Sequence, residues 1–190
     1  MARTATTISA SDFSVIRVNR KFHWPEVQLN IWLLVVLAGS ATCLGIFSWF
    51  MAVQRQMNLG IPWVFPFMIA TSGLALLFFF LIIFLAFQRA LIPEIIILGS
   101  FILFVLWLTG VIGTAIQMFT DKANVYSNCQ NYVADNQFRG SSINTLAWLT
   151  QINICNCWKT AFAFEVINDV FFLWMLFMSW QVRKQTTDYN

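Results

Sequence analysis

Two acidic residues stand inside the last long apolar stretch of the sequence. Glu165 and Asp169 are four residues apart, so a helix places them on one face, with Asn168 beside them. Ionisable groups inside a bilayer are rare and are usually functional, and the sharper hypothesis is therefore a protonatable site for an ion or a proton. Gln117, in the preceding apolar stretch, is a candidate neighbour.

The same residues also fit a structural role. They could form a polar patch turned into a helix bundle, with the acids protonated or hydrogen-bonded to Asn30, Thr114 or Gln117. The apolar stretches contain no Lys or Arg to pair with them, and the other stretches lack the polar residues that a conduction path requires. We favour the structural role and keep the ion or proton site as its alternative.

Three cysteines form a second group that could carry chemistry. Cys129, Cys155 and Cys157 all lie between the third and fourth apolar stretches. A bond from Cys129 to either of the others would close this segment, whereas a bond between neighbours two apart would be strained. The cysteine left over is free or pairs between chains. A zinc site is not favoured, because the only histidine, His23, lies near the N-terminus, across the membrane.

The composition places these residues in a membrane protein. The chain of 190 residues is 59% hydrophobic and 10% charged, whereas a soluble domain carries about 25% charged residues. So few charges cannot cover a surface that faces water. The formal net charge of +3 is also small for a nucleic-acid-binding protein.

Four apolar segments are long enough to cross a bilayer as helices. A hydrocarbon core of about 30 Å needs about 20 residues of α-helix, and the runs are continuous rather than alternating, which excludes barrel strands. The predicted spans are residues 29–53, 60–87, 95–120 and 160–182. We therefore expect an all-α protein, an antiparallel bundle of four transmembrane helices within residues 29–182.

Basic residues predict the orientation of this bundle. Lys and Arg gather on the cytoplasmic side of membrane proteins. Seven of them lie in the N-terminal arm, the second connection and the C-terminal tail, against four in the first and third connections. Both termini are therefore predicted to be cytoplasmic, with an arm over residues 1–28, a tail over residues 183–190 and one extracytoplasmic loop over residues 121–159.

The N-terminal arm combines basic and aromatic residues just before the first span. Arg17, Arg20 and Lys21 are candidate contacts to anionic lipid, which attracts such segments by about 1 kcal/mol per basic residue. The simpler interpretation is that these residues only set the orientation. In the long loop, residues 142–149 could form a short helix on the outer membrane surface, or pack over the mouth of the bundle.

Tryptophans and small residues give two further expectations about the spans. Indole rings prefer the two membrane interfaces. The sequence therefore predicts Trp49, Trp63 and Trp158 near one interface and Trp24, Trp32 and Trp180 near the other. Trp107 and Trp174 fit neither interface and are expected to be packing residues. Small residues allow helices to approach closely in lipid. Those considered include Ala41, Gly45, Gly99, Gly110 and Gly113. Contacts within one chain are favoured over homo-oligomerisation through one such face.

The sequence contains no recognisable catalytic constellation. A Ser–His–Asp arrangement cannot form when the one histidine lies in the N-terminal arm, and neither a Gly-rich phosphate loop nor a metal motif is found. We therefore expect a protein that is not an enzyme and that needs no cofactor.

The order of these features resembles one family. Four spans, two short connections, a longer third loop with cysteines and cytoplasmic ends are similar to MARVEL-domain proteins, especially the fungal ones. The stretch from Cys155 to Phe164 carries the resemblance, since cysteine and tryptophan precede small and aromatic residues that open the last span. The likeness covers about residues 25–182, and the pair Glu165 and Asp169 departs from the expected pattern.

The resemblance implies a non-enzymatic role in membrane apposition, in lateral membrane domains or in the trafficking of other membrane proteins. The expected location is the plasma membrane or a membrane of the secretory pathway. Two other functions stay open. One is a small transporter or channel that uses Glu165 and Asp169, and the other is an accessory subunit of a larger membrane enzyme.

Overall fold

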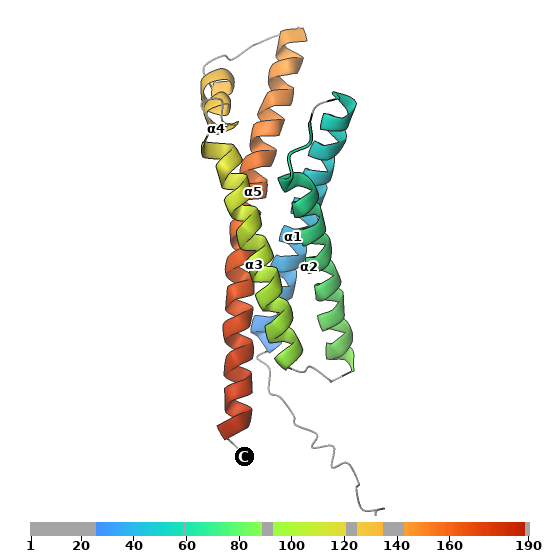
Figure 1. Cartoon of the computed structure of the whole chain (residues 1–190), viewed down its shortest axis with the longest axis vertical. Coiled ribbons are helices and arrows are strands. Elements are labelled where there is room, and N and C mark those ends of the chain that lie inside the picture. Colours follow the sequence, from blue (N-terminus) through green and yellow to red (C-terminus); the bar gives the residue numbers. More distant parts are fainter. Residues whose placement is uncertain (1–25, 59, 89–92, 121–124, 135–142, 189–190) are drawn as a thin grey trace, which may run out of the picture.

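The computed structural model describes five stretches of the chain, and nearly all of them are helical (Figure 1). The described stretches are residues 26–58, 60–88, 93–120, 125–134 and 143–188. Along the chain the elements are α1 (Glu26–Gln56), α2 (Val64–Phe87), α3 (Pro93–Phe119), α4 (Val125–Asn128), the π-helix η2 (Cys129–Ala134) and α5 (Ile143–Asp188). These stretches contain no strand, so the all-α class is confirmed.

Four of these helices, α1, α2, α3 and α5, are long and apolar enough to cross a membrane. The first three agree with the predicted spans to within four residues at each end. Local chemistry explains where some of them begin and end. α1 ends just before Asn58, which has a φ of 52°, a left-handed conformation that asparagine tolerates after a helix. α3 begins at Pro93, whose fixed φ suits a first helical position.

The last helix is much longer than the sequence predicts. α5 begins at Ile143, seventeen residues before the predicted span, and continues to Asp188. Its 46 residues correspond to about 69 Å of α-helix. The second part of the predicted loop over residues 121–159 is therefore helical. The prediction of a separate surface helix over residues 142–149 is wrong, because the described residues of this range form the first turns of α5.

The reason for this error is physical. Hydropathy marks where a chain enters lipid, and a helix that also packs against protein can start well before that point. The outer part of α5 contacts η2, and a disulfide ties it to that element. The polar residues and Lys159 that interrupt the apolar pattern therefore do not interrupt the helix.

The long helices enclose one core, with α1 and α3 each packed against both α2 and α5. Residues later in α1 contact residues earlier in α5. Trp32 Nε1 donates a hydrogen bond of 2.8 Å to the carbonyl oxygen of Phe171. Further along α1, the Phe50 ring stacks on Trp158, with centroids 5.2 Å apart.

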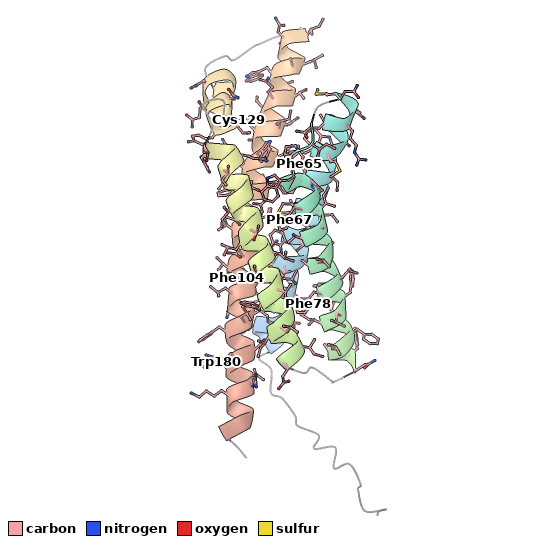
Figure 2. The ribbon with its side chains drawn as sticks, viewed as in Figure 1. Phe65, Phe67, Phe78, Phe104, Cys129 and Trp180 are labelled. Atoms are coloured by element: carbon pink, nitrogen blue, oxygen red, sulfur yellow. A yellow bond between two sulfur atoms is a disulfide. The ribbon has the colours of Figure 1, made fainter. Side chains whose placement is uncertain are left out.

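Glycines on α3 receive large side chains from α2. A β-carbon on Gly99 would collide with the Phe78 ring, and one on Gly110 would collide with the sulfur of Met68. Figure 2 labels Phe78 on the side of the bundle where these two helices lie. These glycines therefore make contacts within the chain. Gly45 on α1 differs, because nothing lies within 4 Å of a β-carbon there and its surface is exposed.

Two of the tryptophans predicted for the membrane interfaces are packed inside the bundle. Trp32 and Trp158 are both buried, because each finds aromatic partners between α1 and α5. Trp107 is buried, as the packing interpretation requires. Trp174 was also expected to pack inside, but much of its surface is exposed. Among the tryptophans that the structure describes, Trp49, Trp63, Trp174 and Trp180 are exposed.

Candidate functional site

The two acids of the last span have different surroundings. Glu165 is fully buried, with 0% of its surface exposed. Thr114 on α3 donates a hydrogen bond of 3.0 Å from Oγ1 to Glu165 Oε1. The second carboxyl oxygen, Oε2, is buried without a hydrogen-bond partner. This contact joins α3 to α5 inside the bundle, between residues 51 positions apart in the sequence.

Only one of the three neighbours considered for the acids is observed as a partner. Thr114 binds Glu165. Asn30 is exposed, and Gln117 is half-buried. No hydrogen bond joins either of them to Glu165 in the part of the chain that the structure describes. The sequence identified the correct acid and a set of neighbours, but it could not rank them, because the rotation of each helix about its axis was unknown.

Asn168 forms a separate contact with α1. Its surface is fully buried, and a β-carbon built on Gly39 would lie 2.5 Å from its Oδ1 and 2.7 Å from its Nδ2. The carboxamide therefore fills the space that the missing side chain of Gly39 leaves open. Both polar atoms of this amide are buried without a hydrogen-bond partner. Gly39 was not singled out from the sequence, although a glycine inside a span is a packing signal.

Asp169 lies one turn after Glu165 and is only half-buried. Its Oδ1 is nevertheless shielded and has no hydrogen-bond partner. The four residues predicted as one polar site, Glu165, Asn168, Asp169 and Gln117, are therefore not joined into one hydrogen-bonded group among the described residues. Glu165 contacts α3, and Asn168 contacts α1.

The interior holds more hydroxyl groups than the sequence interpretation allowed for. Serines and threonines on all four long helices are fully or almost fully buried: Ser40, Thr71, Ser72, Ser100, Thr114 and Ser179. The hydroxyl oxygens of the four serines lack a hydrogen-bond partner. Apart from Thr114, the sequence interpretation did not consider these hydroxyl groups, because small hydroxyl side chains change a hydropathy average little. Such oxygens can bind water or a cation.

The structure shows which cysteines pair, a question that the sequence left open. Cys129 and Cys155 form a disulfide, with α-carbons 5.8 Å apart. Cys157 is free and half-buried, and Cys43 is free and buried in the core, as expected. The thiol of Cys43 lies 3.8 Å from the carbonyl oxygen of Ala161. The disulfide fixes η2 against the outer part of α5.

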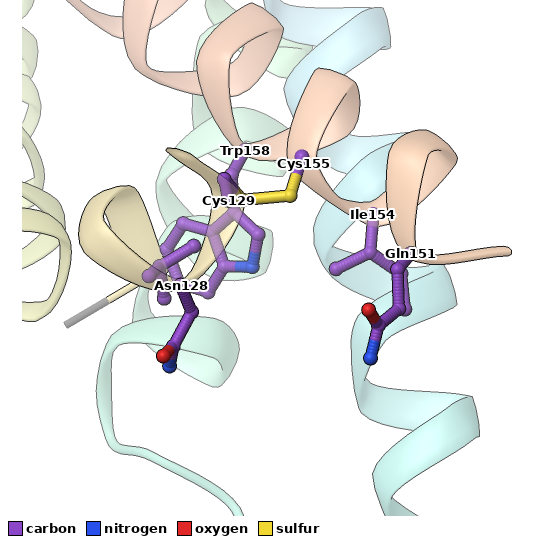
Figure 3. A pocket seen from close by; sticks show the side chains of 7 residues that line it. Asn128, Cys129, Gln151, Ile154, Cys155 and Trp158 are labelled. Carbon is purple, nitrogen blue, oxygen red and sulfur yellow. A yellow bond between two sulfur atoms is a disulfide. The ribbon is translucent and has the colours of Figure 1, made fainter. Parts of the chain in front are cut away.

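A cavity of about 340 Å³ lies beside this disulfide (Figure 3). From α4 and η2 it is lined by Val125, Asn128 and Cys129. From α5 it is lined by Gln151, Ile154, Cys155 and Trp158. The α5 residues recur at intervals of three, one and three, so they share one helical face. The sequence interpretation missed this cavity because it treated these residues as a loop; the same spacing would have revealed a helix face.

The described residues contain no group of three His, Cys, Asp or Glu side chains that could hold a metal ion. Arg17, Arg20 and Lys21, the candidate lipid contacts, lie outside the described residues. Two sites therefore stand out: the buried acid with its threonine, and the cavity at the disulfide. Both lie on α5, about two turns apart between Trp158 and Glu165.

No family model, curated protein or solved structure matches this chain. The resemblance to MARVEL-domain proteins therefore rests on the residues described above and stays a prediction.

Proposed function

We propose that this chain is a multi-pass membrane protein that associates with other membrane proteins through its extracytoplasmic end. The observation that carries the proposal is the extension of α5. Residues 143–159 precede the predicted span and continue the same helix for about 25 Å. A span needs about 20 residues of helix, so α5 is more than twice the length that crossing the membrane requires.

The surface of this extension favours contact with protein. Ile143 is 84% exposed, Leu146 is 67% exposed, and Leu149 is exposed as well. No charged residue occurs from Ile143 to Trp158. A helix that faces only water normally carries charges, and an exposed apolar patch on a protein surface is typical of an interaction site.

The disulfide and the basic residues support the proposed orientation. A stable disulfide is expected on the oxidising side of a membrane, and Cys129 and Cys155 lie in the connection predicted to be extracytoplasmic. The proposed bundle is antiparallel, with both termini in the cytoplasm, in the plasma membrane or the secretory pathway. The order of contacts between α1 and α5 supports the antiparallel arrangement.

The proposed role is non-enzymatic: organising membrane domains, or associating with and trafficking other membrane proteins. The resemblance to MARVEL-domain proteins points the same way. The partner can be another membrane protein or a second copy of this chain, since Gly45 leaves a small-residue position open on the outer face of α1.

The test compares three forms of the full chain purified in mild detergent. Co-purifying membrane proteins are quantified by mass spectrometry for the wild type, for a variant of the exposed apolar positions and for a matched control in the same stretch. The test variant is Ile143→Ser, Leu146→Ser and Leu149→Ser. The control variant is Asn144→Ala, Ala147→Ser and Thr150→Ala, at positions that are also exposed.

Loss of one membrane partner in the test variant, with retention in the control, supports the proposal. A partner present at a fixed ratio in every preparation would favour an accessory subunit of a larger complex. Identical partners in all three forms, or none in the wild type, would contradict association through α5.

A transporter or channel is the second candidate, and the burial of Glu165 favours it. One carboxyl oxygen of Glu165 has no hydrogen-bond partner inside the bundle, and unpartnered serine hydroxyls lie in the same interior. Proton and sodium flux into liposomes containing the protein would test this function. Flux that disappears in Glu165→Gln, but persists in the matched control Glu94→Gln at the exposed start of α3, would establish it.

A further inference from the structure

The cavity beside the disulfide is a partly open pocket between two parts of the chain. Its two walls belong to different elements, and the bond between Cys129 and Cys155 holds them together. Figure 3 shows Asn128 and Gln151 on opposite sides of the pocket, with the Trp158 ring on the same side as Asn128. The volume of about 340 Å³ lies within the range of pockets that bind small molecules, roughly 300–1,000 Å³.

The lining defines the chemistry of a ligand. None of the lining side chains carries a charge, so a charged head group would find no ion-pair partner among them. The exposed carboxamide of Gln151 offers hydrogen-bond donors and an acceptor, and Asn128 lines the facing wall. Val125, Ile154 and the indole of Trp158 offer apolar surface. A molecule with a hydroxyl or amide head and an apolar body matches both parts.

The position of the cavity along the bundle supports an amphiphile. Trp158 stands two residues before the predicted span, and its ring stacks on Phe50. The neighbouring Trp49 is exposed at that level, where indole rings mark a membrane interface. Gln151 lies two turns further from the span, about 10 Å along α5. The apolar end of the cavity therefore lies at the level of the membrane surface and the polar end lies outside it.

We propose that this cavity binds an uncharged amphiphile, with its head at Asn128 and Gln151 and its apolar body against Ile154 and Trp158. The ligand is either a neutral lipid from the outer leaflet or a small neutral molecule from outside. Both share the same chemistry. This site is separate from the exposed apolar positions of the partner surface, and it goes beyond the proposed association.

Photo-crosslinking in lipid nanodiscs tests the site with the full-length oxidised protein. The probes are a long-chain monoacylglycerol that stays in the bilayer and a short-chain monoacylglycerol that dissolves in water, each with a diazirine in its chain. A diazirine fatty acid of the same length serves as the charged counterpart. Crosslinked positions are mapped by mass spectrometry, and excess unlabelled monoacylglycerol measures saturation.

Two variants and one control locate the probe. Ile154→Trp fills the apolar end, and Gln151→Leu removes head-group hydrogen bonds at an exposed position where folding is not at stake. Asn153→Leu is the matched control, because Asn153 is exposed on the same helix outside the cavity. Binding is expected to weaken by about tenfold in each of the two cavity variants, and not in the control.

Saturable labelling of the lining segments by either neutral probe, reduced in Gln151→Leu and Ile154→Trp, supports the proposal. The probe that labels identifies the source, bilayer or water. Equal labelling by the charged fatty acid would overturn it, because the site would not select for an uncharged head. Labelling confined to lipid-facing helix surfaces, or unchanged in both cavity variants, would overturn it as well.

Discussion

At the scale of single residues, the bundle depends on close fits between unlike side chains. Gly39 and Asn168 show this most directly, because the amide occupies the place of a β-carbon. Thr114 and Glu165 show the polar counterpart, a hydrogen bond between two buried side chains on different helices. Lipid supplies no hydrophobic force between helices, so shape and hydrogen bonds must hold them together.

The contact between Gly39 and Asn168 predicts a loss of stability when one methyl group is added at Gly39. Gly39→Ala should destabilise the bundle by about 1–3 kcal/mol, because Asn168 is fully buried and cannot move aside easily. Denaturation in mixed detergent micelles, followed by tryptophan fluorescence, measures the change. Gly45→Ala is the control, and it should be neutral or stabilising by up to about 1 kcal/mol, since alanine favours a helix.

Adding Asn168→Ala to Gly39→Ala should recover part of the loss, because it removes the colliding amide. Equal effects of Gly39→Ala and Gly45→Ala would show that the amide does not constrain this position.

Removing the hydrogen bond between Thr114 and Glu165 should destabilise the bundle less than Gly39→Ala does. Thr114→Val removes the donor while keeping the side-chain shape, and should cost about 1 kcal/mol, within the range measured between membrane helices. Thr109→Val is the matched control, because the Thr109 hydroxyl is exposed and binds the carbonyl oxygen of Val105 on its own helix. The same unfolding assay applies. If the two variants lost the same stability, the bond between helices would contribute nothing beyond a local one.

At the scale of elements, the sequence predicted the bounds of α1, α2 and α3 better than the start of α5. Uninterrupted apolar runs located α1, α2 and α3, because a charged residue inside lipid is costly enough to leave a clear boundary. The sequence contains no comparable boundary at the start of α5. The first turns of α5 are uncharged and mix apolar with polar side chains, and the disulfide and contacts with η2 hold the outer part of the helix.

The disulfide predicts a local loss of structure when it is removed. Cys129→Ser and Cys155→Ser should each increase amide hydrogen exchange over residues 143–158, while the exchange of the membrane-spanning part of α5 stays slow. A bond that spans 26 residues is expected to contribute about 3 kcal/mol through loop closure. Hydrogen–deuterium exchange with mass spectrometry makes the comparison.

Cys157→Ser is the matched control for this experiment, because Cys157 is free and lies two residues from Cys155. Amide hydrogen exchange in Cys157→Ser should match that of the wild type. Thiol titration of the unfolded, unreduced chain should count two free thiols, from Cys43 and Cys157. Protection that persists in Cys155→Ser would mean that packing alone holds the outer part of α5.

At the scale of the whole molecule, the sequence predicted the class and the number of candidate spans. It named three candidate cysteines for a disulfide but left their pairing open. It did not predict the cavity, because that site exists only when α4, η2 and α5 are brought together. It also did not predict that Glu165 and Asn168 contact different helices. Both depend on helix rotation and packing, which hydropathy does not encode.

The basic residues predict the topology of the whole chain. In a background of Cys43→Ser and Cys157→Ser, Asn144→Cys should react with a membrane-impermeant maleimide on intact cells, because Asn144 is exposed at the start of α5. Asn190→Cys should react only after the membrane is permeabilised, if both termini are cytoplasmic. The reverse pattern would place the cysteine-containing connection in the cytoplasm and would overturn the proposed orientation.

The unbroken course of α5 has a mechanical consequence. A continuous helix behaves as a rigid lever, so a change in its tilt within the bilayer must swing the end that projects from it. A tilt of about 10° moves the tip of a 25 Å projection by about 4 Å. Membrane helices tilt when the bilayer becomes thinner. In the proposed orientation, a change in membrane thickness would therefore shift the exposed apolar residues at the outer end of α5.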